Sequence, residues 1–309
     1  MGKIAFVFPG QGSQAVGMGM DAYEAQPEAR AIFDAADEAL GFSLSSLIAQ
    51  GPAESLNQTI NTQPALLTTS MAYLEVLKRT GMTPDYVAGH SLGEYSALVA
   101  AGVLSFEDAV KLVRARGQFM EEAVPGGQGA MAAVIGAERE ALSALCDSIT
   151  AAGDLVELAN VNCSGQIVIS GSRAGVQTAS ERVKEAGGKR AIMLEVSGPF
   201  HSSLMKEAAS RIEERLGSVA FHTPTVPVVA NVTAQAVTDG EAFRRLLVEQ
   251  VYSPVLWEDT VKLLVAEGVD TLVEIGPGSV LTGLARKIDR SLKVITINSL
   301  ESVSVHMPA

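Results

Sequence analysis

The sequence contains few of the residues that form disulfides or bind transition metals. Its 309 residues include two cysteines, Cys146 and Cys163, and four histidines. The cysteines lack C-x-x-C or ligand-like spacing and the histidines are scattered, so no pattern indicates a disulfide framework or a metal site. We therefore expect two reduced, buried thiols and no bound metal.

Long apolar runs are also missing. No segment reaches the roughly 18 uninterrupted apolar residues of a membrane-spanning helix. The apolar run at 4–8 is too short for the core of a signal peptide, and Pro-Gly-Gln-Gly follows it at 9–12. These absences lead us to expect a cytoplasmic protein without membrane contact.

Positive charge is scarce, because 23 lysines and arginines face 35 acidic residues, a net charge of −12. Such a chain cannot neutralise phosphates over a broad face, which excludes nucleic acid as an expected partner. What the sequence does have is apolar residues, at 47%, and enough length for one large α/β domain with a smaller insert.

Apolar residues follow two different patterns along the chain. Short apolar runs that end in Gly or Ser turns and mostly lead toward helical patterns predict a parallel α/β sheet, and they lie at 4–8, 87–88, 226–229 and 271–275. Between them the pattern is β-α-β-β-α-β, the ferredoxin-like unit. Its strands are expected at 129–135, 155–159, 166–170 and 190–196, and its helices at 138–149 and 173–186.

Glycine and proline loops bracket this second pattern at 125–127 and 197–199. The fold we predict is therefore α/β, with a hydrolase-like large domain, residues 1–125 and 198–309, that holds a mostly parallel sheet. A ferredoxin-like subdomain, residues 126–197, is inserted in it. The cleft between the two is the expected ligand site.

One serine lies at a predicted sharp turn between a short strand and an Ala-rich helix. Gly89, Ser91 and Gly93 form the Gly-x-Ser-x-Gly pattern of a nucleophile elbow, in which the flanking glycines leave room for the tight turn. Ser91 would then project beside the positive end of the following helix, where free backbone N–H groups can stabilise an oxyanion. The simpler alternative is an ordinary Gly/Ser turn.

Two polar residues lie on apolar helix faces. Arg116 is three residues after Val113 and four after Leu112 on the helix predicted at 106–121, so it points with the core. A guanidinium there needs a fixed anion, either a protein carboxylate or the carboxylate of a ligand. Gln250 occupies a similar position on the helix predicted at 240–252 and needs a buried partner.

A nucleophilic serine needs a base, and the histidines offer few candidates. His90 adjoins Ser91, but neighbouring side chains on an extended segment diverge, so a packed structural role is expected for it. His222 and His306 lie in a loop and a tail. His201 lies where the chain leaves the subdomain, at the edge of the expected cleft, and is the best candidate for the general base.

The first apolar run leads into a glycine-rich turn. Gly10, Gly12 and Ala15 match G-x-G-x-x-A, so a dinucleotide site has to be considered. Pro9 interrupts the junction of strand and turn, and no acidic residue lies at a strand end at the required distance. A better use of this turn is to supply a backbone N–H to an oxyanion hole.

Six motifs in chain order carry a family resemblance. They are residues 8–14, 62–65, 89–95, 116–117, 199–202 and 274–278. With these motifs the chain resembles the malonyl-coenzyme A:acyl carrier protein transacylases of bacterial fatty-acid synthesis over nearly its whole length. The resemblance implies transfer of a malonyl group from malonyl-coenzyme A to the pantetheine thiol of acyl carrier protein, through a malonyl-serine intermediate. Coenzyme A thioester is a substrate here, and no cofactor is implied.

The resemblance also assigns residues. It implies Ser91 as nucleophile, His201 as base, Gln250 as the residue whose main-chain carbonyl orients the imidazole, and Arg116 as the ligand of the malonyl carboxylate. The oxyanion hole would be the N–H groups of Gln11 and Leu92, with Gln63 lining the pocket. Phe200, by similarity to the acyltransferase domains of polyketide synthases, would favour malonyl over methylmalonyl.

Carriers of this family are acidic like this chain, so docking needs a local basic patch. Arg286 and Lys287, with Arg290, form the densest cluster near a Gly-rich turn, and Lys189 with Arg190 is a second candidate. A merely solvated charged face is the alternative for both. The expected oligomeric state is a monomer.

Two other functions remain open from sequence. A serine hydrolase of the α/β-hydrolase type would need a late histidine, for which only His306 is available. A non-catalytic module that docks the carrier protein would have no use for Ser91, His201 and Arg116 together.

Overall fold

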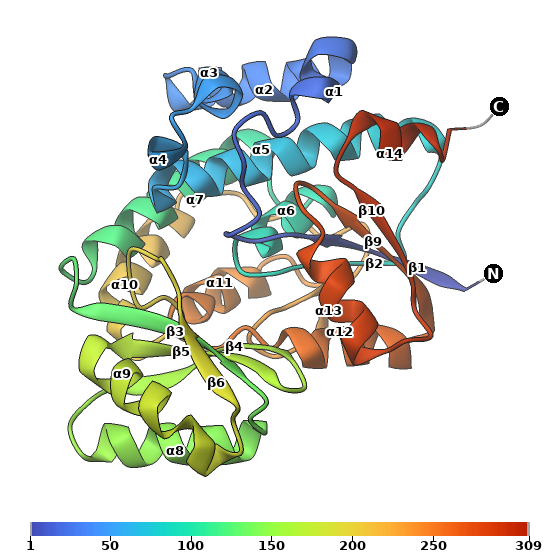
Figure 1. Ribbon diagram of the computed structural model, residues 1–309. Coiled ribbons are helices and arrows are strands. Elements are labelled where there is room, and N and C mark those ends of the chain that lie inside the picture. Colours follow the sequence, from blue (N-terminus) through green and yellow to red (C-terminus); the bar gives the residue numbers. More distant parts are fainter. Residues whose placement is uncertain (1, 308–309) are drawn as a thin grey trace.

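The chain folds into two sheets with helices packed around them. The computed structural model describes residues 2–307, and Figure 1 shows the smaller sheet with its own helices to one side of the larger one. The strands are β1 (Lys3–Phe8), β2 (Tyr86–Gly89), β3 (Gly129–Ile135), β4 (Val156–Cys163), β5 (Gln166–Ser172), β6 (Arg190–Met193), β7 (Val228–Val229), β8 (Ala236–Val237), β9 (Val269–Ile275) and β10 (Lys293–Ile297).

Helices make up much of the remainder. The α-helices are α1 (Met20–Ala25), α2 (Pro27–Leu40), α3 (Leu44–Gln50), α4 (Ala53–Leu56), α5 (Thr59–Leu77), α6 (Leu92–Ala100), α7 (Phe106–Glu122), α8 (Arg139–Ala151), α9 (Arg173–Arg182), α10 (Lys206–Leu216), α11 (Ala242–Tyr252), α12 (Trp257–Ala266), α13 (Val280–Ile288) and α14 (Leu300–Ser304). Short 3-10 turns are η1 (Lys78–Thr80), η2 (Val183–Ala186) and η3 (Ser203–Met205). Within residues 2–307, no helix combines the length and apolar character needed to cross a membrane.

The larger sheet has the strand order β10-β9-β1-β2-β7-β8, and all its neighbours are parallel except β7 and β8. Side chains of β1 alternate: Phe6 and Phe8 pack in the core that contains α5, α6 and α7, while Ala5 and Val7 pack in the core with α12 and α13. A sheet covered on both faces needs continuous apolar strands, which is the pattern of this sequence. The predicted α/β fold with a mostly parallel sheet is confirmed.

The smaller sheet is antiparallel, in the order β4-β5-β3-β6. On β3, Ala130, Ala132 and Val134 pack against α8 and α9, while Met131 faces the larger core. This is the predicted β-α-β-β-α-β unit. The strand expected at 190–196 is shorter: Leu194, directly after β6, still donates its N–H to the carbonyl of Met131 at 2.9 Å, and the chain then bends at 197–198. The domain boundaries at 125/126 and 197/198 stay a prediction.

Strand β4 joins the smaller sheet to the segment that follows α11. Val161 donates its N–H to the carbonyl of Val255 at 2.9 Å, and the N–H of Val255 bonds the carbonyl of Ala159 at 2.9 Å. This isolated parallel bridge lies a few residues after α11. The smaller sheet is thereby held beside the helix that carries Gln250.

Candidate active site

Ser91 lies between the end of β2 and the start of α6. Its backbone has φ 52° and ψ −108°, a left-handed conformation that is strained for a residue with a side chain. A Cβ atom on Gly89 would lie 1.9 Å from the carbonyl carbon of Gly93, and one on Gly93 would lie 2.1 Å from the carbonyl oxygen of Phe8. Strand and helix touch here, so both flanking positions require glycine.

The elbow opens into a cavity of about 610 Å³. Ser91, Arg116 and His201 line it together with Met131 and Val168, which lie on the face of the smaller sheet away from α8 and α9. Near the start of α13, the cavity is lined by Val280, Leu281 and Leu284. The cavity thus lies between residues of the two sheets, where the sequence predicts a cleft.

Ser91, His201 and Gln250 form a hydrogen-bonded chain. Ser91 Oγ lies 2.7 Å from Nε2 of His201, and Nδ1 of the same ring lies 2.7 Å from the main-chain oxygen of Gln250. A carbonyl oxygen can only accept, so Nδ1 carries the proton and Nε2 is free to accept from the Ser91 hydroxyl. The geometry is that of a nucleophile, its base and a group that orients the base.

The imidazole of His201 is kept neutral by its surroundings. The residue is only 3% exposed, and burial together with the positive charge of Arg116 lowers the pKa of His201 to about 3. The hydrogen bond to Gln250 opposes this shift but is smaller. Near neutral pH the ring therefore has a free lone pair with which to accept a proton.

Arg116 lies buried on the inner face of α7, as its position among apolar residues predicts. Its Nη2 lies 3.1 Å from Ser91 Oγ and 2.9 Å from Oε1 of Gln250, and its Nη1 lies 2.9 Å from Oε1 of Gln63. Within residues 2–307 no carboxylate forms a salt bridge with it, and its Nε is buried without a partner. A guanidinium held by neutral groups beside a nucleophile can receive the carboxylate of a ligand.

The two backbone N–H groups expected in the oxyanion hole belong to neighbouring turns. Phe8 pairs with Gly89 at the ends of β1 and β2, so the chain segments that lead to Gln11 and Leu92 leave the sheet side by side. A Cβ on Gly10 would lie 2.4 Å from the carbonyl oxygen of His90, which shows how closely the turns pack. Across residues 2–307, neither N–H has a hydrogen-bond acceptor.

Three site residues escaped the sequence-based prediction. Glu94 accepts a hydrogen bond from Nε2 of Gln250 at 2.6 Å, and Asn231 accepts one from the N–H of Ser91 at 2.8 Å. Asn162 lies 2.8 Å from Nε2 of His90, which therefore has the packed, hydrogen-bonded position expected of it. A charged residue in the otherwise uncharged helix α6 was a usable signal for Glu94. Asparagines after strands are too common to be one.

Glu94 is buried under the elbow with 1% exposure. Burial raises the pKa of Glu94 to about 8, against the hydrogen bonds from Gln250 and Asn231 and the charge of Arg116. The buried carboxyl, the amide of Gln250 and the guanidinium thus form one polar network beneath Ser91.

The remaining predicted residues differ in their relation to the cavity: Phe200 lines it, whereas Gln63, expected to line it, does not, and neither do Arg286 and Lys287. Phe200 is buried and lines the cavity next to His201, and Gln63 contacts Arg116 and the sulfur of Met120. Arg286 and Lys287 are exposed in the last turn of α13, beyond the residues of this helix that line the cavity.

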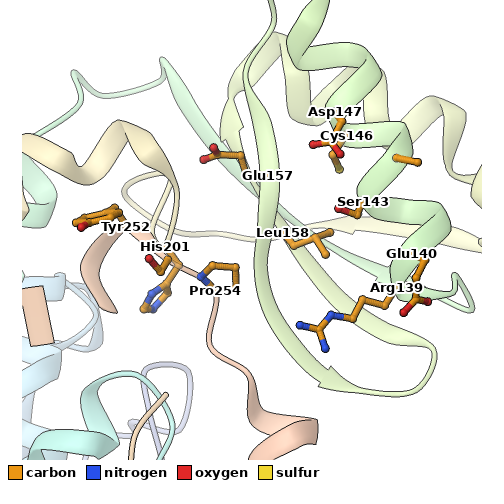
Figure 2. Close-up of a pocket in the computed structure, with 12 residues that line it drawn as sticks. Arg139, Glu140, Ser143, Cys146, Asp147, Glu157, Leu158, His201, Tyr252 and Pro254 are labelled. Atoms are coloured by element: carbon orange, nitrogen blue, oxygen red, sulfur yellow. The ribbon is translucent and has the colours of Figure 1, made fainter. Parts of the chain in front are cut away.

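A second cavity, of about 630 Å³, lies on the other side of His201 (Figure 2). Figure 2 shows His201 and Pro254 across from the α8 side chains Arg139, Glu140 and Ser143. Neither Ser91 nor Arg116 lines it. His201 is therefore part of the wall between two cavities, and only the one with the elbow contains the nucleophile.

Cys146 and Cys163 are free and buried, as expected. Among residues 2–307 no group of three His, Cys, Asp or Glu side chains is arranged to hold a metal ion.

Comparison with known proteins gives consistent matches over the full length. The profile of the acyl transferase domain family matches residues 5–304. The malonyl CoA-acyl carrier protein transacylase of Bacillus subtilis is 57% identical over 99% of this chain and 96% of its own. The crystal structure of an acyl carrier protein S-malonyltransferase from Vibrio cholerae has a TM-score of 0.95 at 47% identity, covering 98% of this chain and 99% of that one.

A further solved structure contains a partner. It is a malonyl-transacylase in complex with a type II PKS acyl-carrier protein, with a TM-score of 0.95 and 45% identity over 99% of each chain. Sequence identity and fold agree with the serine, histidine and arginine that meet in the cavity. This chain belongs to the acyl transferase domain family, among the malonyl CoA-acyl carrier protein transacylases.

Proposed function

We propose that this acyltransferase moves a malonyl group from malonyl-coenzyme A to the pantetheine thiol of acyl carrier protein, through a malonyl ester of Ser91. One observation carries the proposal: Oγ of Ser91 lies within hydrogen-bond distance of both His201 Nε2 and Arg116 Nη2. A base and a carboxylate anchor at one nucleophile fit an acyl group that ends in a carboxylate. The names of the relatives support the same donor and acceptor.

In the first half-reaction, Ser91 Oγ attacks the thioester carbonyl while Nε2 of His201 takes its proton. The N–H groups of Gln11 and Leu92 are the proposed donors to the oxyanion of the tetrahedral intermediate. The intermediate collapses by breaking the carbon–sulfur bond, and the leaving sulfur of coenzyme A takes the proton from His201. Arg116 holds the malonyl carboxylate throughout.

In the second half-reaction, the thiol of the carrier gives its proton to His201 and attacks the ester carbonyl. The same N–H groups stabilise the second oxyanion, and the ester bond to Ser91 breaks as Oγ recovers a proton. Gln250 orients His201 through a neutral carbonyl. In the first half-reaction this costs little because the leaving thiolate of coenzyme A needs less acid assistance than an amine, and in the second half-reaction the protonated ring returns its proton to Oγ of Ser91.

Other features belong to the same proposal. Phe200 lines the cavity, and we infer that its ring would leave no room for an α-methyl group on the acyl chain. Arg286 and Lys287 offer a basic patch for an acidic carrier in the last turn of α13, the helix whose first turns line the cavity. A monomer is consistent with the exposed large apolar residues, which are mostly scattered, and a cytoplasmic location is consistent with two free thiols.

Intact mass spectrometry after mixing with malonyl-coenzyme A tests the reaction. We expect the mass of one malonyl group on Ser91, no adduct in Ser91→Ala, and loss of the adduct when carrier protein with its pantetheine thiol is added. Ser96→Ala is the matched control, since its buried hydroxyl lies on the same helix and has no hydrogen-bond partner within residues 2–307. Release of free malonate without a thiol acceptor would instead indicate a hydrolase.

A further inference from the structure

The conformation of Ser91 needs an external support. Ser91, His201 and Ala234 are the non-glycine residues with positive φ among residues 2–307, and Ser91 has φ 52°. Such conformations persist only where the surroundings over-determine them. The glycines at 89 and 93 permit the tight turn, but they do not hold the serine in it.

Asn231 contacts the elbow from both sides with one planar amide. Its Oδ1 accepts the N–H of Ser91 at 2.8 Å, and its Nδ2 donates to the carbonyl of Gly89 at 2.6 Å. The side chain therefore bridges the residues before and at the nucleophile. It is fully buried, so water does not compete for these bonds.

The strand order of the larger sheet places Asn231 beside the elbow. Ala88 pairs with Val229 in the parallel ladder of β2 and β7, and Asn231 follows two residues after the end of β7. The chain beyond β7 thus runs beside the chain beyond β2, where the elbow begins. No local sequence pattern around Ser91 contains this contact.

Asn231 is itself held in place by the catalytic network. Its N–H points to Oε1 of Glu94 at 3.4 Å, its carbonyl accepts the N–H of Leu256 at 2.9 Å, and its Oδ1 lies 3.4 Å from Nε2 of Gln250. Gln250 also donates to the carbonyl of Ser91 at 2.9 Å. The residue that orients His201 is thereby connected to the residue that bridges the elbow.

We propose that Asn231 is a positioning residue, which holds Ser91 in its strained conformation so that Oγ points at His201. The proposal rests on the role of Ser91 as nucleophile in the proposed function. An amide is required because an acceptor must face the N–H of Ser91 while a donor faces the carbonyl of Gly89. Leucine has the shape but neither group, and an ionised aspartate has no donor.

Two variants test this proposal, with the rate of first acylation of Ser91 by malonyl-coenzyme A measured by rapid quench and intact mass. Asn231→Leu should slow acylation by about 10²-fold at saturating substrate, with little change in KM, because a nucleophile misplaced by about 1 Å loses about that factor. Ser96→Ala should keep the wild-type rate. A thermal melt of each variant reports whether it is folded.

The second variant, Asn231→Asp, is tested by the pH dependence of its acylation rate. This pH dependence would not differ from that of the wild-type protein if Asn231 were merely structural. When ionised, the carboxylate repels the carbonyl of Gly89, and acylation should be slow. When protonated, it regains an O–H for Gly89 and keeps an acceptor for Ser91, so its rate should rise as pH falls from about 7, below the pKa of about 8 of the neighbouring Glu94, toward the raised pKa expected of a buried aspartate. The wild-type rate should not rise over this range.

Folded Asn231→Leu with the wild-type rate, or Asn231→Asp with the wild-type pH profile, overturns the proposal. If Asn231→Leu does not fold, the pH profile of Asn231→Asp decides alone. Absence of any adduct on Ser91 in the wild-type protein would overturn the proposed function as well. Normal wild-type acylation with unaffected Asn231 variants would overturn only the role of Asn231.

Discussion

Arg116 places its Nη2 atom 3.1 Å from the Oγ of Ser91, although one residue begins a helix at the elbow and the other lies within the next helix, α7. The same guanidinium bonds the amide oxygens of Gln63 and Gln250, which are neutral. The guanidinium forms no salt bridge within residues 2–307, so a ligand carboxylate bound to it would be paired with a positive charge next to Ser91. In the proposed function, Arg116 would thus hold the carboxylate of the acyl group close to the reacting atom.

Arg116→Ala should change which acyl group the enzyme prefers. The lost charge-assisted contact is worth about 1.5–3 kcal/mol, so the preference for malonyl- over acetyl-coenzyme A should fall by about 10- to 150-fold. Measuring kcat/KM for both donors checks this. Arg114→Ala is the control, because Arg114 lies on the same helix, bonds Asn61 and does not line the cavity. An equal fall for both donors would make Arg116 structural.

His201→Ala should slow both half-reactions. Loss of a general base costs about 10²- to 10⁴-fold, and the same ring serves both proton transfers. Quenched-flow measurement of serine acylation, followed by transfer to carrier, reports each step separately. If acylation kept its wild-type rate in this variant, another base would have to be sought.

Acylation should be insensitive to pH across the range where a free histidine titrates. Burial and Arg116 lower the pKa of His201 to about 3, so the ring stays neutral and kcat/KM should remain flat from about pH 7, below the pKa of about 8 of Glu94, to about pH 5. Arg116→Ala removes one of the causes, and its acid limb should move to higher pH. An acid limb near pH 6.5 in the wild-type protein would contradict the expected environment of the imidazole.

The same pKa shift affects stability. In the unfolded chain His201 titrates near its ordinary pKa of about 6.5, so below that pH the unfolded state binds a proton that the folded state does not. The stability contributed by the neutral ring is therefore fully present above about pH 6.5 and is lost as pH falls toward 3. Urea unfolding at several pH values should show that the free energy of unfolding decreases less with falling pH in His201→Ala than in the wild-type protein.

Charge reversal at Arg286 and Lys287 should weaken binding of the carrier protein without affecting the reaction with malonyl-coenzyme A. KM for carrier protein should rise and its salt dependence should weaken, since an acidic partner loses local attraction. Acylation of Ser91 by malonyl-coenzyme A should stay largely intact. Arg215→Glu on α10 is the control, an exposed arginine outside the cavity lining. Equal loss in both half-reactions would place the cluster at the coenzyme A site instead.

Local patterns in the sequence determined the elbow, the buried strands and the inward-facing polar residues of this protein. The glycines around Ser91 follow from the contact of strand and helix, and the apolar strands follow from a sheet covered on both faces. Arg116 and Gln250 stood out because helical periodicity alone places a side chain on a buried face. These features depend on residues within a few positions of one another, so one segment of sequence contains the whole signal.

Only the tertiary structure decided which distant groups meet. His201 rather than His306 bonds Ser91, Glu94 bonds Gln250, and Asn231 bridges the elbow. These contacts depend on strand order and on main-chain atoms: β7 lies beside β2, and the partner of His201 is a backbone carbonyl. A backbone carbonyl is present at every residue, so side-chain identity cannot single it out. The packing of the sheet selects which one is used.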